Sequence, residues 1–591
     1  MKHIEKLNLI REKMDERGID AYLIPSSDPH ISEYLPDRYK CVEWVSGFTG
    51  SAGTLVITQS FAGLWTDSRY FVQAGEQLQG TGFELVPLKK QGAFEYVSWI
   101  GEHLPKGSVV SFDGKLASVR VAHVLDTELQ SKGFRIEGNV DVLTDIWQDR
   151  PELPTEKAFL LTVEEVGQSV KEKLKLVRKH LRNKEADMHV VSSLDDVAWI
   201  LNIRGSDVPC NPVVLSFLWI SQESATLFID PIKLNSEEIF ILEQAGVKIE
   251  NYTKIFQVLK AMNSDKTVWL DPQRTCYAVY SALMDKNIVE EMNPSTLLKS
   301  VKNDTEIQHV RNVMVKDGVA LTKFFKWLEE NVEKRELTEI SISEKLREIR
   351  SDQKGFVDIS FDTIAGYLAH GALPHYKATD KSNAVLQSKG LLLVDSGGQY
   401  RDGTTDITRV ISLGGITNEE KKDYTLVLKG MIEGSTAVYP KGTCGYQIDA
   451  LTRKPLWDAF RNYGHGTGHG VGFFLNVHEG PQILNPSNTN IPLEKGMISS
   501  IEPGLYREGK YGIRIENLVL TKELESNGFG DFYGFETLTL CYIDTALVDK
   551  QYLEQKHISW LNNYNKLVFE KLSESLNPEE EQWLAEKTKA I

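Results

Sequence analysis

The chain of 591 residues is long enough for about three or four domains of typical size. Its apolar content of 41% and its charged content of 25% are ordinary for a globular protein. The net charge of −16 argues against nucleic acid as a main partner, because phosphate binding needs a basic surface.

Residues 1–20 mix charged and apolar side chains at helical spacing and lack the apolar core of a signal peptide. Nowhere does an apolar run approach the roughly 18 residues that a membrane span requires. Five scattered cysteines, with no CxxC pair among them, suit a reducing compartment better than a disulfide scaffold. We therefore expect a cytoplasmic protein that does not enter a membrane.

The first half of the chain contains an internal repeat. Residues 6–28 have the pattern of an amphipathic helix followed by a strand, and residues 173–196 have it again. The aligned pairs are Asp20 with Asp187, Trp44 with Trp199, and Gly50 with Gly205. Two related α/β domains are therefore predicted at residues 1–150 and 155–300, joined by a segment that contains two prolines.

A long amphipathic helix is predicted to open a third domain at residues 303–545. Sequence typical of strands and glycine-rich turns begins near Leu391, and the candidate chemistry lies after it. Residues 546–591 are predicted to return to helix as a C-terminal extension. The start signals of its final helix are an N-cap residue, a first-turn proline and a capping-box partner: Asn577, Pro578 and Glu580.

Four carboxylates lie at the ends of, or inside, apolar strand-like segments of this third domain. They are Asp395, Asp406, Glu502 and Glu516. Any one of them could be an ordinary turn residue or a solvated strand end. Glu516, however, stands among strand-forming residues and is predicted to share one strand face with Arg514, where a lone carboxylate would be a poor choice.

The run GHGTGHGVG, Gly464 to Gly472, adds two imidazoles, His465 and His469, among glycines. Taken alone it could be a flexible loop with two solvated histidines. With the four carboxylates, one imidazole of this run would make a ligand set too anionic for a single structural zinc ion. Such a set suits two divalent ions about 3.5–4 Å apart, with Mn²⁺ preferred and Co²⁺ or Zn²⁺ as alternatives.

In their order and contexts these residues resemble the ligand set of the pita-bread metallopeptidases. The segments FDTIAGYLAHGALPHY, GTGHGVGFFLNVHEGP and IEPGLY with GIRIEN resemble aminopeptidase P most, and the resemblance runs over essentially the whole chain. It implies an α/β (α+β) fold with two creatinase-like N-terminal domains, a pita-bread catalytic domain and a short helical C-terminal extension. It also implies a homodimer that releases the first residue from peptides with a free N-terminus and proline second.

The resemblance assigns the five ligands as well. Asp395 would hold one ion, His469 and Glu502 the other, and Asp406 and Glu516 would bridge the two. A hydroxide shared by the ions would attack the Xaa-Pro bond, and Glu502 would pass the proton to the departing proline nitrogen.

Several further residues match the substrate-facing positions of the family. His375 and His478 would bind the peptide and support catalysis, His465 would line the pocket, and Arg514 would lie nearby and orient Glu516. In the first domain Arg69 could contact the peptide, or it could form an ordinary strand pair with Asp67. His375 could instead be a packed residue, and His478 could form a surface pair with Glu479. His370 and His309 receive no role.

Two alternatives from other classes stay open. A prolidase would use the same metals but would cut only Xaa-Pro dipeptides. A non-catalytic pita-bread domain would bind peptides without metal, although such domains lack the ligands that this sequence keeps.

Overall fold

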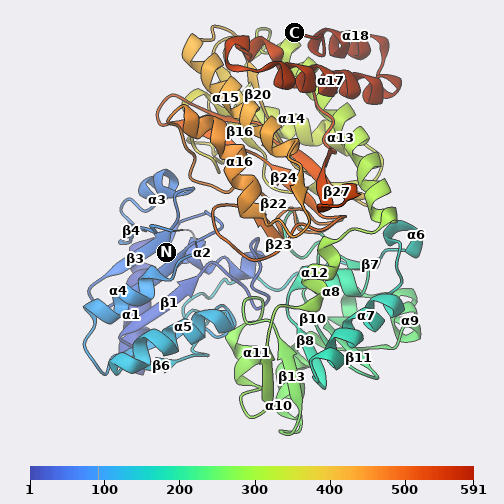
Figure 1. Cartoon of the computed structure of the whole chain (residues 1–591). Coiled ribbons are helices and arrows are strands. Elements are labelled where there is room, and N and C mark those ends of the chain that lie inside the picture. The colour runs from blue at the N-terminus through green and yellow to red at the C-terminus, as the bar shows by residue number, and fades with distance from the viewer. Residues whose placement is uncertain (91) are drawn as a thin grey trace. The chain divides into compact units, whose positions relative to one another are not determined.

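A computed structural model describes residues 1–90 and 92–591, and the chain forms two compact units (Figure 1). The first unit comprises residues 1–163 and 168–296, and the second comprises residues 164–167 and 297–591. Among the residues described, no helix is both long enough and apolar enough to cross a bilayer.

The first unit contains two six-stranded sheets with the same strand order. The first sheet has the order β4-β3-β2-β1-β5-β6 and the second has the order β12-β11-β10-β8-β13-β14. Their strands are β1 (Ala21–Pro25), β2 (Thr54–Thr58), β3 (Ala62–Thr66), β4 (Glu84–Pro87), β5 (Val109–Phe112) and β6 (Arg135–Glu137), then β8 (Met188–Val191), β10 (Ser216–Ser221), β11 (Ala225–Ile229), β12 (Val247–Glu250), β13 (Thr267–Leu270) and β14 (Asn287–Glu290). The longer helices of the unit are α1 (His3–Arg17), α4 (Glu95–His103), α5 (Val119–Leu129), α7 (Val170–Asn183) and α9 (Ser236–Gln244).

The predicted internal repeat is confirmed by its hydrogen bonds. Asp20 accepts a hydrogen bond from the N–H of Val109 at 2.7 Å, and Asp187 accepts one from the N–H of Thr267 at 2.9 Å. Each aspartate thus ties the start of the first strand of its repeat to the same neighbouring strand of its own sheet, β5 in one and β13 in the other.

The aligned tryptophans also repeat one contact. Lys6 Nζ lies 4.4 Å from the centre of the Trp44 ring and donates to the Trp44 carbonyl at 2.6 Å. Lys173 Nζ lies 4.6 Å from the centre of the Trp199 ring and donates to the Trp199 carbonyl at 3.1 Å. In both halves, a lysine in the first turn of the helix therefore donates a hydrogen bond to the backbone carbonyl of the aligned tryptophan.

The second unit packs long helices against several small antiparallel sheets. Its helices are α13 (Asp304–Asn331), α14 (Glu339–Ser351), α15 (Asn418–Ser435), α16 (Gly445–Asp458), α17 (Gln555–Leu572) and α18 (Pro578–Lys587). The sheets are β15-β18-β19, β16-β17-β20, β21-β28-β27-β24-β22-β23 and the pair β25-β26. Four of these strands are β15 (Phe356–Ile359), β18 (Gly398–Tyr400), β19 (Gly403–Thr404) and β21 (Tyr439–Pro440). The strands nearest the site are β16 (Ile364–Tyr367), β17 (Leu391–Ser396), β20 (Ile407–Ser412), β22 (Gly468–Gly470), β23 (Glu479–Leu484), β24 (Ile498–Ile501), β25 (Gly504–Arg507), β26 (Tyr511–Arg514), β27 (Asn517–Asn527) and β28 (Gly530–Thr537).

The predicted helix starts are confirmed. Asn577 accepts hydrogen bonds from the N–H groups of Glu579 and Glu580, while Glu580 accepts one from the N–H of Asn577. These bonds satisfy backbone donors that the first turn of α18 cannot pair internally. Asn303 and Glu306 cap α13 in the same way.

One predicted strand is interrupted. The sequence YGIRIENLVL alternates as a single strand would, but β26 ends at Arg514 and β27 begins at Asn517, and the two strands belong to different sheets. Residues 511–520 are all buried, so the alternation does not separate a core face from a solvent face. Glu516 lies in the break between the two strands.

The C-terminal extension packs on its own chain, where α17 contacts α13 and α15 (Figure 1). Its apolar residues Leu561, Val568 and Leu572 are fully buried there. The extension therefore buries these apolar residues against its own chain and completes the core of the second unit.

Removal of the chain from Lys550 onward should therefore destabilise the second unit. The deletion uncovers the apolar surface that α17 buries on α13 and α15, and burial of each large aliphatic side chain contributes about 1.5–3 kcal/mol. We expect insoluble protein or a melting temperature well below that of the full chain in a thermal denaturation experiment. An unchanged melting temperature would show that the extension is dispensable for the fold.

Candidate metal centre

Strand ends bring the first two carboxylates together. β17 pairs antiparallel with β20, so that Asp395 lies opposite Thr408 in the register. Asp406 directly precedes β20, and its side chain is buried beside that of Asp395. The apolar residues of β17 are buried along its whole length, so the strand delivers a carboxylate into the interior.

His469 lies on a strand rather than in a flexible loop. β22 is flanked by β23 on one side and by β24 on the other. A Cβ atom at Gly468 would lie 1.9 Å from the carbonyl oxygen of Ser500, and one at Gly470 would lie 2.1 Å from that of Glu479. The glycines therefore let two neighbouring strands close on His469, and the prediction of a solvated loop is wrong.

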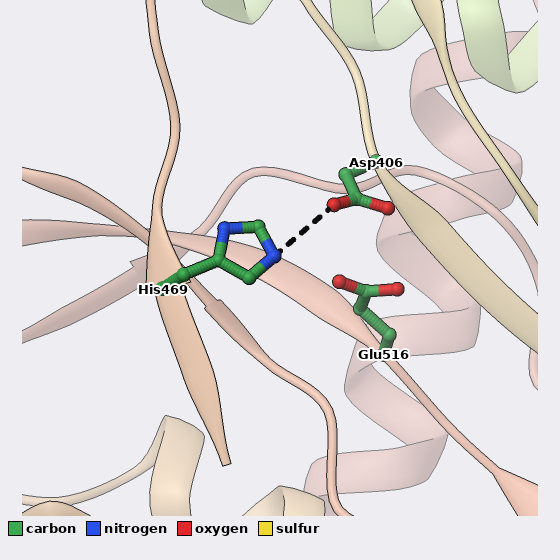
Figure 2. A group of neighbouring side chains, drawn as sticks. All are labelled: Asp406, His469 and Glu516. Carbon is green, nitrogen blue, oxygen red and sulfur yellow. Dashed lines mark ion pairs between the residues drawn. The ribbon is translucent and has the colours of Figure 1, made fainter. Parts of the chain in front are cut away.

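The imidazole of His469 faces the carboxylates. Its Nε2 lies 3.5 Å from Asp406 Oδ2 and 3.4 Å from Glu502 Oε1. Figure 2 shows Asp406, His469 and Glu516 turned toward one another, and one potential ligand atom from each lies within 4.8 Å of the others. The site thus unites one nitrogen donor with carboxylate oxygens from separate strands.

Ser500 links two members of this group. Its hydroxyl donates to Glu502 Oε1 at 3.1 Å and accepts from the N–H of His469 at 3.0 Å. The N–H of Glu502 in turn donates to the carbonyl of Thr467 at 2.7 Å. The backbone of β22 and the end of β24 are therefore held in a fixed register beside the carboxylates.

A buried guanidinium holds Asp395. Arg514 Nη2 donates to Asp395 Oδ2 at 2.5 Å, Nη1 donates to the hydroxyl of Tyr506 at 2.7 Å, and Nε donates to Thr408 Oγ1 at 3.2 Å. We expected Arg514 to orient Glu516, but that contact runs through Thr408, whose hydroxyl donates to Glu516 Oε2 at 2.9 Å. The break after Arg514 explains the difference, because it turns Glu516 away from the β26 face.

Burial and mutual repulsion raise the pKa of these carboxyl groups. The pKa of Asp406 is well above its ordinary value because the group is desolvated and faces Asp395 and Glu502. Desolvation, followed by repulsion from Asp406, Glu502 and Asp395, raises the pKa of Glu516. Desolvation, opposed by Arg514, raises the pKa of Glu502 to about 7. In the charged form these groups therefore destabilise the fold near neutral pH unless a cation lies among them.

Two oxygens of these four carboxylates have no hydrogen-bond partner among the described residues. They are Asp395 Oδ1 and Glu516 Oε1, and both are buried. An unsatisfied buried oxygen of a charged group is costly. Hard anionic oxygens with one imidazole nitrogen are the donors that divalent cations such as Mn²⁺ prefer, so the residues present fit a metal centre.

The predicted substrate-facing histidines lie around this group. The ring of His478 lies edge-on to that of His469, with centroids 4.4 Å apart. His465 Nε2 lies 2.8 Å from the hydroxyl of Tyr506, which also accepts from Arg514. His375 follows Pro374, whose carbonyl accepts from Arg514 Nη2 at 3.3 Å.

The surface-pair alternative for His478 is wrong, because Glu479 is buried and its carboxylate binds Lys302 at 2.5 Å with both side chains fully enclosed. His370 has a partner that the sequence did not suggest: its Nδ1 lies 2.9 Å from Glu339 Oε1. Glu339 is fully buried and also accepts from the hydroxyl of Tyr376 at 2.8 Å. This carboxylate fixes the segment that carries His375.

Arg69 belongs to the first unit and forms the predicted pair with Asp67. Its Nε and Nη2 each lie 2.8 Å from one carboxylate oxygen. Its contact with a peptide remains a prediction. His309 lies on α13, where its Nε2 is 3.1 Å from the carbonyl of Glu164, in keeping with the absence of an assigned role.

Thr408, Tyr506 and Glu339 were missed in the sequence. Thr408 stands two positions after Asp406, the spacing of side chains on one face of a strand, and that periodicity was the one available signal for it. Tyr506 and Glu339 make their contacts with residues at least eight positions away, and no local pattern distinguishes them.

Comparisons with known proteins cover the entire length of the chain. Residues 6–143 and 149–306 each match the creatinase/prolidase N-terminal domain, residues 308–523 match metallopeptidase family M24, and residues 531–591 match the C-terminal region of peptidase M24. A probable Xaa-Pro aminopeptidase P of Paracoccidioides brasiliensis is 40% identical, over 99% of each chain.

The chain belongs to the Xaa-Pro aminopeptidases of metallopeptidase family M24. A crystal structure of X-prolyl aminopeptidase from Caenorhabditis elegans, described as a cytosolic enzyme with a di-nuclear active site, covers 100% of both chains with a TM-score of 0.96 and 36% identity. An Xaa-Pro dipeptidase from Bacillus anthracis, 24% identical with a TM-score of 0.50, covers 63% of this chain and 98% of its own, and shares the fold. The predicted fold class and family are thereby confirmed.

The close approach of β26 to the segment before His375 provides a test of the site geometry. A Cβ atom at Gly512, on β26, would lie 1.6 Å from the carbonyl oxygen of Gly371, in the segment that leads to His375. Gly512→Ala should therefore displace that segment or β26 and lower kcat/KM by at least about 10²-fold, since a shift of about 1 Å at a catalytic group can cost that much. Steady-state kinetics measures the effect.

Gly528→Ala is the matched control, because a Cβ atom at Gly528 would meet nothing within 4 Å. This variant should keep full activity. Normal kinetics for Gly512→Ala would contradict the placement of the segment against β26.

Proposed function

We propose that this enzyme releases the N-terminal residue from peptides whose second residue is proline, with two divalent cations at the centre described above. The observation that carries the proposal is the convergence of buried carboxylates and one imidazole in a chain that aligns over its whole length with Xaa-Pro aminopeptidases. The proposed substrates are peptides with a free N-terminus, and the preferred cation is Mn²⁺, because a carboxylate-dominated site suits it better than Zn²⁺.

Five side chains are proposed to hold the cations, namely Asp395, Asp406, His469, Glu502 and Glu516. When bound, two such ions activate water for attack and polarise the carbonyl of the first peptide residue. Arg514 keeps one oxygen of Asp395 engaged and leaves the other available. Thr408 does the same for Glu516.

Glu502 is proposed as the group that moves the proton to the departing proline nitrogen. It is the most accessible of the four carboxylates, with a side chain that is 17% exposed, against 10% for Asp395 and 5% for Asp406. Ser500 holds its Oε1 at 3.1 Å and so keeps the carboxylate turned toward His469. A proton shuttle needs this combination of fixed position and access to the peptide.

His375 and His478 are proposed to bind the peptide and to stabilise the developing oxyanion. His478 lies against His469, and the backbone of Pro374 next to His375 is tied to Arg514. His465, through Tyr506, is proposed to line the pocket.

We further propose a homodimer located in the cytoplasm. Most of the apolar residues of the C-terminal extension are buried against its own chain, although Leu567 is 37% exposed. Exposed apolar residues do occur at the end of α16, where Phe460 is 93% and Trp457 is 48% exposed. Such side chains are typical of a surface that binds another protein.

The substrate proposal is tested with a panel of Xaa-Pro, Xaa-Pro-Yaa and Xaa-Ala-Yaa peptides, with and without added Mn²⁺. We expect release of the first residue from Xaa-Pro-Yaa and little or none from Xaa-Ala-Yaa, measured by chromatography of the products. Cleavage of the dipeptide alone would replace the proposal with a prolidase. Absence of any cleavage and of any bound metal would favour a peptide-binding domain.

Glu516→Gln tests the ligand assignment. The amide keeps the shape of the side chain but removes a negative charge from the proposed bridge, so at least one ion per chain should be lost and activity should fall by several orders of magnitude. Elemental analysis and kinetics measure both effects. Glu536→Gln, which removes a carboxylate that pairs with Arg311, serves as the control and should keep the metal content.

Two further variants separate ligands from peptide-binding groups. His375→Ala and His478→Ala should each keep the metal content but lower kcat by about 10²–10³-fold, the range for loss of a donor to developing charge. His103→Ala, at an exposed position at the end of α4 in the first unit, is the control and should leave kcat unchanged. Loss of metal in either of the first two variants would move that histidine into the ligand set.

A further inference from the structure

The C-terminal extension places one polar group inside the catalytic unit. Tyr564 on α17 is only 5% exposed. Its hydroxyl lies 2.9 Å from a guanidinium nitrogen of Arg409 and 2.9 Å from each of the carbonyl oxygens of Thr539 and Cys541. A hydroxyl can accept one bond while donating another, so it connects the guanidinium to the backbone that leads into the extension.

Arg409 is buried, and its guanidinium donates hydrogen bonds to the backbone beside the metal centre. Its Nη1 donates to the carbonyl of Glu516 at 2.6 Å and to that of Thr408 at 3.0 Å. Its Nη2 donates to Asn517 Oδ1 at 2.8 Å and to the carbonyl of Cys541 at 2.8 Å as well as to Tyr564, and its Nε donates to the carbonyl of Tyr542 at 3.0 Å. One planar group therefore holds Glu516 and Asn517, the first residue of β27, beside the backbone that leads into the extension.

Thr408 and Glu516 also bind each other, and these bonds orient the carboxylate of Glu516, which is the proposed bridging ligand. The N–H of Glu516 donates to the carbonyl of Thr408 at 3.1 Å, and the hydroxyl of Thr408 donates to Glu516 Oε2 at 2.9 Å. Glu516 has no regular strand around it to fix its backbone. Its direction thus depends on Thr408 and on the guanidinium behind both residues.

We propose that Tyr564 is a positioning residue for Glu516, and that the C-terminal extension is thereby a working part of the active site. Tyr564, together with the carbonyls of Cys541 and Tyr542, fixes the plane of Arg409. Arg409 fixes the carbonyls of Glu516 and Thr408, and these two residues fix the carboxylate. The inference rests on the proposed metal-binding role of Glu516. Loss of the extension is therefore expected to impair the chemistry as well as the stability.

The test compares two neighbouring residues of α17 in the full-length protein. Tyr564→Phe removes one oxygen atom and keeps the ring, so the variant should fold. Asn565→Ala is the control, because Asn565 is also buried and binds the N–H and carbonyl of Ile543 at 3.1 and 3.3 Å, while the hydrogen bonds of Arg409 go to other residues. Both variants lose buried hydrogen bonds of the same helix.

Metal affinity is measured by competition for Mn²⁺ with a fluorescent chelator, together with the melting temperature of the metal-free protein, kcat and KM. We expect Tyr564→Phe to weaken Mn²⁺ binding by about tenfold, as does loss of a residue that supports a metal ligand, and to lower kcat with little change in KM. Asn565→Ala should lower the melting temperature and bind Mn²⁺ as the unmodified protein does. Arg409→Lys, which cannot reach both carbonyls in one plane, should weaken binding further.

Unchanged Mn²⁺ affinity in Tyr564→Phe would overturn the proposal, and so would equal weakening in Asn565→Ala, since that would be a general effect of stability. If the unmodified protein bound no Mn²⁺ and cleaved no Xaa-Pro-Yaa peptide, the proposed function itself would fail. The two failures are therefore distinguishable.

Discussion

The repulsion among four carboxylates in one buried site is the constraint on which the rest of the catalytic unit depends. Burial and neighbouring charge raise the pKa of Asp406, Glu502 and Glu516, and the fold supplies one guanidinium, that of Arg514, in direct contact with Asp395. A protein that places such groups together without compensation loses stability near neutral pH. Divalent cations supply the compensation, which ties the stability of the fold to its function.

Hydrogen bonds from neighbouring polar side chains hold these carboxylates in place. Arg514 joins Asp395 to Tyr506 and, through Thr408, to Glu516. Ser500 joins His469 to Glu502. Four of the five proposed ligands are thus fixed by a polar partner, as is usual for metal sites, where partners of the ligands set their direction and basicity.

Much of this molecule could be predicted from its sequence because the signals are local or repeated. The pairs Asp20 with Asp187 and Trp44 with Trp199 identify the repeat. The two aspartates bind equivalent strands of two sheets of the same order, and the two tryptophans lie on helices and receive the same lysine contact. The cap at Asn577 depends on residues within one turn of it.

What escaped prediction depends on contacts between distant segments. Alternation in YGIRIENLVL predicted one strand, but the break at Glu516 is stabilised by Arg409, more than a hundred positions earlier in the chain. Tyr564 appeared to be one of many residues of an amphipathic helix, and only the fold brings its hydroxyl to Arg409. The glycines beside His469 suggested a loop, whereas they serve the close approach of β23 and β24.

The most direct test of the central claim is calorimetric titration of metal-free protein with Mn²⁺ at neutral pH, with the melting temperature followed in parallel. If the carboxylates require cations, the titration should show about two equivalents bound per chain and the melting temperature should rise with occupancy. Binding of less than one equivalent, or full binding with no gain in stability, would contradict the account.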